Sequence, residues 1–182
     1  MSGLQRITDA SIRLDSMPAE GRDLVLDVDA GERAAIADQL GITAVERLSV
    51  KLHADRFSGG MRVTGSLRAR IVQPSVVSLE PVTQDIEDSV DRVFLPGSEK
   101  AFASKAEAEV FVDLEGDDVP DHFEGPEADL SGLIIETLAL AIDPYPRLEG
   151  ENLEDLGIAD LNSAPESPFA KLKALKNNDS SD

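Results

Sequence analysis

The sequence predicts an α+β fold, in which an antiparallel sheet built round one hairpin carries two or three helices. Two runs of alternating apolar and polar residues, at about 46–56 and 61–73, flank a Ser-Gly-Gly turn at 58–60. This pattern is typical of two antiparallel strands joined by a tight turn. Three other segments have the composition or the periodicity of helices. The length of 182 residues is enough for one domain with a hydrophobic core.

The N-terminal part of the chain predicts a strand followed by a helix. The segment DLVLDV at 23–28 alternates between polar and apolar residues, as a half-buried strand does. The segment GERAAIADQLG at 31–41 is rich in Ala and ends on glycine, which is typical of a helix with a C-terminal Gly. These two elements precede the hairpin.

The segment after the hairpin, VTQDIEDSVDRVFL at 82–95, fits two periods. Val82, Ile86, Val90 and Phe94 match the even positions of a strand and also a four-residue helical spacing. The content of β-branched residues and the stop at Pro96 favour a third strand. Its intervening polar residues are mostly acids.

The later part of the chain predicts a short strand, an acidic loop and a helix. Residues 110–114 form a brief apolar run, and an acidic segment broken by Pro120 and Pro126 follows. Asp129 is a candidate N-cap for a helix that Pro144 ends. The apolar stripe of this helix predicts that it packs on the sheet; it consists of Leu130, Leu133, Ile134, Leu138, Ala141 and Ile142.

The domain organisation follows from a change of composition near residue 149. Residues 1–148 are predicted to form a single α+β domain. Residues 149–182 begin with an acidic, Asn-, Ser- and Pro-containing stretch that predicts a flexible linker. The ending SPFAKLKALK at 167–176 predicts a short amphipathic helix with Phe169, Leu172 and Leu175 on one side.

The composition excludes several classes of site. There is no cysteine, so disulfides, thiolate nucleophiles and Cys-ligated metals are excluded. The two histidines, His53 and His122, have no second ligand at metal spacing, and the acidic loop lacks calcium-binding spacing. We therefore predict no metal and no other cofactor. The N-terminus does not resemble a signal peptide, and no segment is long and apolar enough to cross a membrane, so we predict a cytoplasmic protein.

The net charge of −19 is unevenly distributed along the chain. Residues 1–79 hold ten acids and ten bases, whereas residues 80–160 hold 23 acids and four bases. One face of the predicted hairpin collects basic residues, and Lys51, Arg62, Arg68 and Arg70 are candidates for contact with RNA or with a partner. A face of this kind is also compatible with simple solvation.

The acidic part of the chain predicts a surface for a basic partner, since opposite charges speed association. The same acids can serve solubility alone. A magnesium-dependent nuclease built on Asp117, Asp118 and Asp121 is disfavoured because nothing in the sequence would hold these carboxylates in place. The sequence contains no motif of a catalytic nucleophile, and we predict that the protein is not an enzyme. The candidate acidic surface consists of Glu107, Glu109, Asp117, Asp118, Asp121 and Glu124.

Three separated segments in register resemble the YceD-like family. They are GSLRARIVQPSVVSLEPV at 65–82, DLSGLIIETLALAIDPYPR at 129–147 and SPFAKLKALK at 167–176. Many members carry C-x-x-C-L-x-P in the first segment, where this chain has serines in the pattern Ser75-x-x-Ser78. A metal or thiol role in such relatives therefore does not extend to this chain. We expect the serine hydroxyls to bond local backbone groups, as Ser does in turns.

The resemblance implies a bacterial or plastid protein that supports the accumulation of 23S ribosomal RNA, without known catalytic residues. Together with the charge distribution, it leads to the hypothesis of a non-enzymatic factor in large-subunit biogenesis. Its expected partner is a basic ribosomal protein or assembly factor. The alternative is direct binding of ribosomal RNA by the basic face of the hairpin.

Overall fold

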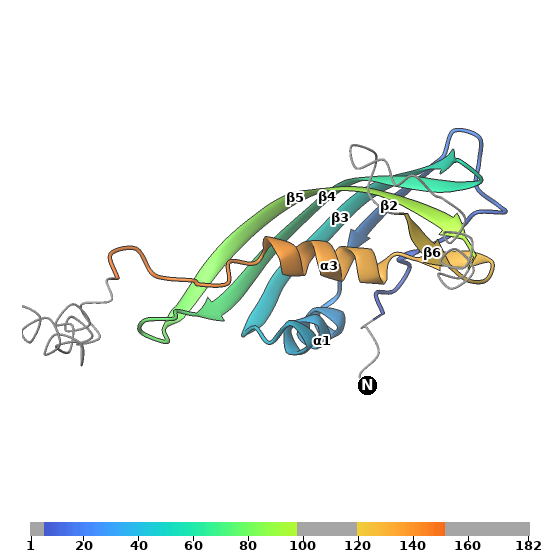
Figure 1. Ribbon diagram of the computed structural model, residues 1–182. Helices are drawn as coiled ribbons and strands as arrows, with labels where there is room; N and C mark the ends of the chain where they lie inside the picture. Colours follow the sequence, from blue (N-terminus) through green and yellow to red (C-terminus); the bar gives the residue numbers. More distant parts are fainter. Residues whose placement is uncertain (1–5, 98–119, 152–182) are drawn as a thin grey trace, which may run out of the picture.

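The computed structural model describes residues 6–97 and 120–151. The α+β prediction is confirmed: the described elements form a sheet with two helices on one of its faces (Figure 1). In chain order they are β1 (Ser11–Arg13), β2 (Arg22–Asp27), α1 (Ala30–Leu40), β3 (Ala44–Phe57), β4 (Gly60–Pro74), β5 (Pro81–Pro96), β6 (Asp121–Phe123), β7 (Glu127–Asp129) and α3 (Ser131–Ala141).

The main sheet has the strand order β2-β3-β4-β5-β6. The first four strands are antiparallel, as the sequence predicts, but β6 runs parallel to β5. The sheet is therefore mostly antiparallel, as predicted, and becomes mixed at this edge. A parallel neighbour requires a long connection, and the chain between β5 and β6 is long enough to provide one.

The β3–β4 hairpin is the predicted one. Its turn consists of Ser58 and Gly59, both with positive φ, 50° and 82° respectively, and Phe57 pairs with Gly60 across it. Two consecutive residues of positive φ are characteristic of a type I′ turn, whose twist matches that of the flanking strands. The turn thus fixes the register of the hairpin as far as Arg47↔Arg70, beyond which an irregularity between Val45 and Arg47 shifts the pairing by one residue.

The third predicted strand is confirmed as β5, which pairs with β4 from Pro74↔Pro81 to Met61↔Phe94. Its even-numbered residues Ile86, Val90 and Phe94 are buried. The other even-numbered residues from Val82 to Arg92 are half-buried, whereas the odd-numbered residues from Pro81 to Asp91 are exposed. This alternation has a period of two, which a helix cannot reproduce.

Helix α1 confirms the predicted helix and begins one residue earlier, at Ala30. Asp29 and Glu32 form a capping box, in which each side chain accepts a hydrogen bond from the other residue's backbone N–H. Gly41 ends the helix in the left-handed region with φ of 67°. Arg33 then attaches the helix to the sheet by donating to the carbonyl oxygens of Val28 and Val45.

Helix α3 confirms the predicted apolar helix, but its first turn differs in detail. The N-cap position is occupied by Leu130, whose side chain makes no capping bond. Asp129 nevertheless accepts a hydrogen bond from the N–H of Ser131 at 2.9 Å. The capping role is therefore displaced by one residue. The N-terminal strand β1, which the sequence analysis missed, pairs with β7 directly before this helix.

The core lies between the sheet and the two helices. It is a single cluster of aliphatic side chains, and within the described residues its aromatic members are Phe94 and Phe123. Because α1 packs on β3 while α3 packs on β4 and β5, one face of the sheet is covered by helices. The described helices leave the opposite face open.

The close approach of β4 to β3 at Gly65 makes a testable prediction. A Cβ on Gly65 would lie 2.0 Å from the carbonyl oxygen of Lys51. We expect Gly65→Ala to lower the free energy of unfolding by about 2–4 kcal/mol, since backbone has to move to accommodate it. Urea denaturation measures this change.

The matched control for this substitution is Gly132→Ala in α3. A Cβ at Gly132 meets nothing within 4 Å, and alanine within a helix is about 0.5–1 kcal/mol more favourable than glycine. The control should therefore be as stable as the unmodified protein or more so. Equal stability of the two variants would show that β3 and β4 do not approach closely at this point.

Candidate functional site

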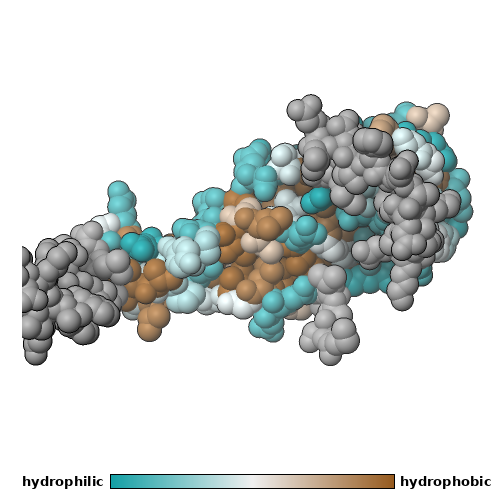
Figure 2. All heavy atoms as spheres, in the orientation of Figure 1, coloured by the Kyte–Doolittle hydropathy of each residue, from teal (hydrophilic) through white to brown (hydrophobic). Residues whose placement is uncertain are grey.

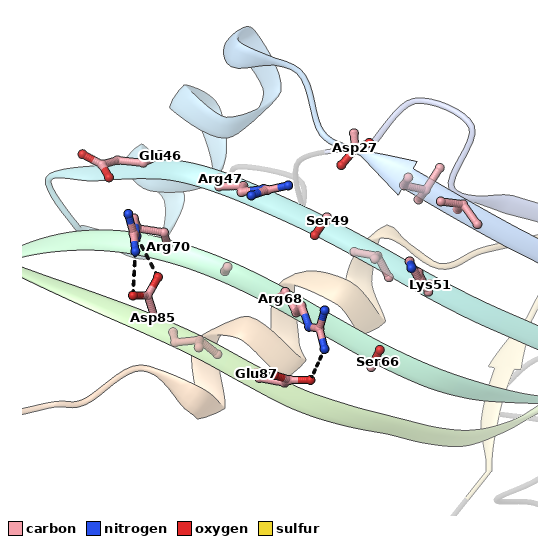
Figure 3. A pocket seen from close by; sticks show the side chains of 15 residues that line it. Asp27, Glu46, Arg47, Ser49, Lys51, Ser66, Arg68, Arg70, Asp85 and Glu87 are labelled. Atoms are coloured by element: carbon pink, nitrogen blue, oxygen red, sulfur yellow. Dashed lines mark hydrogen bonds and ion pairs between the residues drawn. The ribbon is translucent and has the colours of Figure 1, made fainter.

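The open face of the sheet carries the polar residues of β2 to β5 (Figure 3). A groove of about 1080 Å³ runs over this face. Ser49 and Ser66, two small residues from β3 and β4, line the groove together with larger polar side chains (Figure 3). Its charged lining residues are Asp27, Glu46, Arg47, Lys51, Arg68, Arg70, Asp85 and Glu87.

Arginines of β4 pair with carboxylates of β5 along this face. We call the three pairs, Arg62–Asp91, Arg68–Glu87 and Arg70–Asp85, the arginine–carboxylate ladder. The first and third are bidentate, with both N–O distances between 2.7 and 2.8 Å. The second has one bond of 2.7 Å (Figure 3). Bidentate pairs are the most specific form of this contact.

The ladder changes the electrostatics of the open face. Hydrogen bonds from Arg70 and Arg62 lower the pKa of Asp85 and the pKa of Asp91, respectively. All six side chains remain substantially exposed, so each pair contributes little to stability. The main effect of the ladder is to neutralise three arginines that would otherwise be available to a ligand.

The four basic candidates from the sequence do share one face, as the alternation predicts. The acids of β5 lie beside three of them, however, so the face is not uniformly basic. That these residues contact RNA or a partner stays a prediction. Within the described ranges no ion pair involves Lys51 or its β3 neighbour Arg47. Arg47 lies within the predicted strand at about 46–56, in phase with Lys51, so the alternation by itself identifies it.

His53 occupies the same face and lies between two acids. Its Nδ1 is 2.6 Å from Oδ1 of Asp23, and its Nε2 is 3.1 Å from Oδ1 of Asp55. The hydrogen bond to Asp23, followed by that to Asp55, raises the pKa of His53 above its ordinary value of 6.5. The resulting stabilisation is present below that value and is lost as the pH rises through the raised pKa.

The candidate acidic surface is described only in part. Asp121 lies in β6 and Glu124 directly after it, and both are exposed. The other four candidates, Glu107, Glu109, Asp117 and Asp118, fall outside the described residues. The predicted strand at 110–114 and the predicted C-terminal helix fall outside them as well.

The loop between β4 and β5 holds a second polar cluster. Ser75 is fully buried, and its Oγ accepts hydrogen bonds from the N–H groups of Val77 and Ser78. The prediction that the serines bond local backbone groups is therefore confirmed. The sequence analysis missed the further partner, Glu151, whose two carboxylate oxygens accept from the hydroxyls of Ser75 and Ser78.

Glu151 joins the chain after α3 to this loop. The N–H of Leu148 donates to the same carboxylate at 2.9 Å, and the N–H of Val76 donates to the carbonyl oxygen of Pro146. The hydroxyls of Ser75 and then Ser78 lower the pKa of Glu151. The carboxylate thus favours its charged form in this contact.

The helix-bearing side of the molecule has a different surface. Figure 2 shows apolar surface over the part of the molecule where α3 lies. Leu140 of this helix is 76% exposed, and Tyr145 after it is 69% exposed. Neither residue belongs to the predicted apolar stripe, whose six members are all buried or partly buried.

The described residues also bear on metal sites and on membrane-spanning helices. No group of three or more His, Asp or Glu side chains there is arranged to hold a metal ion. In residues 6–97 and 120–151, no helix is long and apolar enough to cross a membrane. That the chain uses no metal or other cofactor stays a prediction.

Comparison with known proteins identifies the family. Residues 63–176, well over half of the chain, match the family described as Large ribosomal RNA subunit accumulation protein YceD. The chain belongs to the YceD family. Neither the curated proteins nor the solved structures provide a match. The YceD-matching region starts inside β4 and contains β5, α3, the Ser75 loop and Glu151.

Glu151 provides a pH-dependent prediction. Because its pKa is lowered from 4.5, the contact should persist above that pH and be lost as the pH falls through the lowered pKa. We expect Glu151→Gln to remove this transition, because the amide carries no charge. Amide chemical shifts of Val77, Ser78 and Leu148, followed from neutral to acidic pH, measure the effect.

The control is Glu149→Gln, which removes the same charge two positions away. It should show the acid transition of the unmodified protein. If Glu151→Gln showed that transition unchanged, the titrating group would have to be a different carboxylate.

Proposed function

We propose that this protein is a non-enzymatic cytoplasmic factor that supports the synthesis, processing or stability of 23S ribosomal RNA through a protein partner. Membership of the YceD family, named for large ribosomal RNA subunit accumulation, supports the connection with this RNA. The partner proposed is a basic ribosomal protein or assembly factor. Binding would use the acidic part of the chain, residues 80–160.

The observation that carries the proposal is the arginine–carboxylate ladder. Binding of RNA phosphates needs cations that are not already engaged, yet Arg62, Arg68 and Arg70 each hold a carboxylate of β5. Each of these pairs is neutral, so the net charge of −19 resides on the rest of the chain. A field of this sign repels RNA and accelerates association with a basic protein.

Neutralising the described part of the acidic surface tests the partner. We expect Asp121→Asn combined with Glu124→Gln to weaken low-salt binding of a basic large-subunit protein about three- to tenfold, as two exposed charge contacts would. Binding should also weaken with added salt. Pull-down with purified ribosomal proteins, followed by titration, measures both effects.

The matched control is Glu20→Gln combined with Asp38→Asn, which removes two exposed acids from the first part of the chain. It should bind like the unmodified protein. Equal weakening by both double variants would mean that total charge, and not the acidic surface, determines binding.

The consequence for the cell can be measured by the ratio of 23S to 16S ribosomal RNA. We expect loss of the protein to lower this ratio selectively, and the double variant at Asp121 and Glu124 to restore it less well than the control pair. A total-RNA gel with and without the protein gives the measurement. An unchanged ratio would contradict a role of this chain in accumulation of the large-subunit RNA.

Direct RNA binding remains the competing function, and one observation favours it. Lys51 and Arg47 line the groove without an ion pair in the described part of the chain. Under the proposal, replacing Lys51, Arg62, Arg68 and Arg70 by Ala leaves retention of ribosomal RNA on filters at low salt unchanged. Loss of retention would establish the groove as an RNA site.

A further inference from the structure

Among the strands that the structure describes, none pairs with the outer edge of β5 over most of its length. It pairs with β4 from end to end, but with β6 only at Phe94, Leu95 and Pro96. From Pro81 to Val93 no described strand pairs with the other edge (Figure 1). An unpaired edge presents a row of N–H and C=O groups that can accept another strand.

The direction of these backbone groups follows from two hydrogen bonds. The N–H of Gly97 donates to the carbonyl oxygen of Phe123, so it points to the side of β6. Because backbone groups alternate in direction along a strand, the other odd-numbered residues of β5 point to the same edge. The second hydrogen bond is consistent with this direction: the N–H of Ser89 donates to the side chain of Asp88 and not to the backbone of β4.

The charges beside this edge have one sign on the open face. Asp85, Glu87 and Asp91 alternate along β5, and their side chains are 68%, 64% and 54% exposed. Each carboxylate holds an arginine of β4 and retains acceptor capacity for a second donor. A strand added outside β5 with cationic residues facing them would continue the alternation of charge across the sheet.

A second copy of the chain fits this edge poorly. Antiparallel pairing of two β5 edges would bring the carboxylates of one copy beside those of the other, which is unfavourable. An acidic edge of this kind disfavours edge-to-edge pairing of two copies, a common purpose of charged edge strands. The same charges favour an extended segment of the opposite sign.

We propose that the edge of β5 from Thr83 to Val93 receives an extended, basic segment of the partner as an additional strand. Lysine or arginine at every second position of that segment would face Asp85, Glu87 and Asp91. Main-chain hydrogen bonds supply affinity in this mode of recognition, and the alternating side chains supply selectivity. The inference rests on the proposed function, in which the partner is a basic protein.

A synthetic peptide with alternating Lys and Thr tests the inference on the full chain. Its control is the same sequence with N-methyl groups on alternate backbone amides, which keeps the charge but prevents strand addition. We expect at least tenfold tighter binding of the unmodified peptide. On binding, the amides of Thr83, Asp85, Glu87, Ser89, Asp91 and Val93 should exchange with solvent more slowly.

Ser89 offers a matched pair of variants. Its N–H donates to the side chain of Asp88 and not to β4, so an added strand would have to recruit this donor from Asp88. Ser89→Pro removes the donor, while the β4 pairing keeps its hydrogen bonds. We expect Ser89→Pro to weaken binding of the unmodified peptide at least tenfold and Ser89→Ala to leave it unchanged. Thermal unfolding shows whether both variants fold. If Ser89→Pro does not fold, slower amide exchange along β5 in the unmodified protein on peptide binding becomes the test of strand addition.

The outcomes separate this inference from the proposed function. Equal binding of both peptides, or no protection along β5, would overturn strand addition. The proposed function would still stand if the Asp121 and Glu124 variant lost a basic ribosomal protein. If no basic ribosomal protein bound to the chain, the proposed function would fail, regardless of how tightly the two peptides bind.

Discussion

Strand β4 is hydrogen-bonded along both of its edges, to β3 through the type I′ hairpin and to β5 through the loop at Ser75. Because side chains alternate between faces, a shift of one residue in either pairing would exchange the core face with the open face. The register therefore places Leu67 and Ile71 in the core and Arg68 and Arg70 on the surface at the same time. Both the packing of the helices and the ladder depend on it.

The ladder determines the electrostatic character of the molecule more than the count of charges does. Three arginines that look like an RNA-binding set in the sequence face three carboxylates of the neighbouring strand. Exposed pairs of this kind add little stability, but they neutralise the positive charge of the three arginines. The excess of acids elsewhere then dominates the field that an approaching macromolecule meets.

The loop from Ser75 to Glu80 shows how this chain builds a junction without cysteine. The resemblance to the YceD-like family implies cysteines at positions 75 and 78 in many relatives. Here two hydroxyls and the carboxylate of Glu151 form the contacts between this loop and the segment after α3. The junction thus consists of hydrogen bonds that depend on pH through one acid.

Much of the fold was determined by local sequence. The hairpin follows from a period of two and α3 from a helical stripe, which a segment expresses without reference to the rest of the chain. Helix α1 follows from its Ala content and terminal Gly, and β5 from its β-branched residues and the stop at Pro96. The residues of the basic candidate face could be found in the same way. Strands β1, β6 and β7 could not, because each has three residues and is too short to show a period.

The tertiary structure alone decided what the polar residues contact. The partners of Arg62, Arg68 and Arg70 lie 29, 19 and 15 residues away in the chain, and only the register of two strands brings them together. Glu151 reaches Ser75 across 76 residues. Alternation in the sequence assigns a side chain to a face, whereas the neighbour it meets on that face depends on the pairing of distant strands.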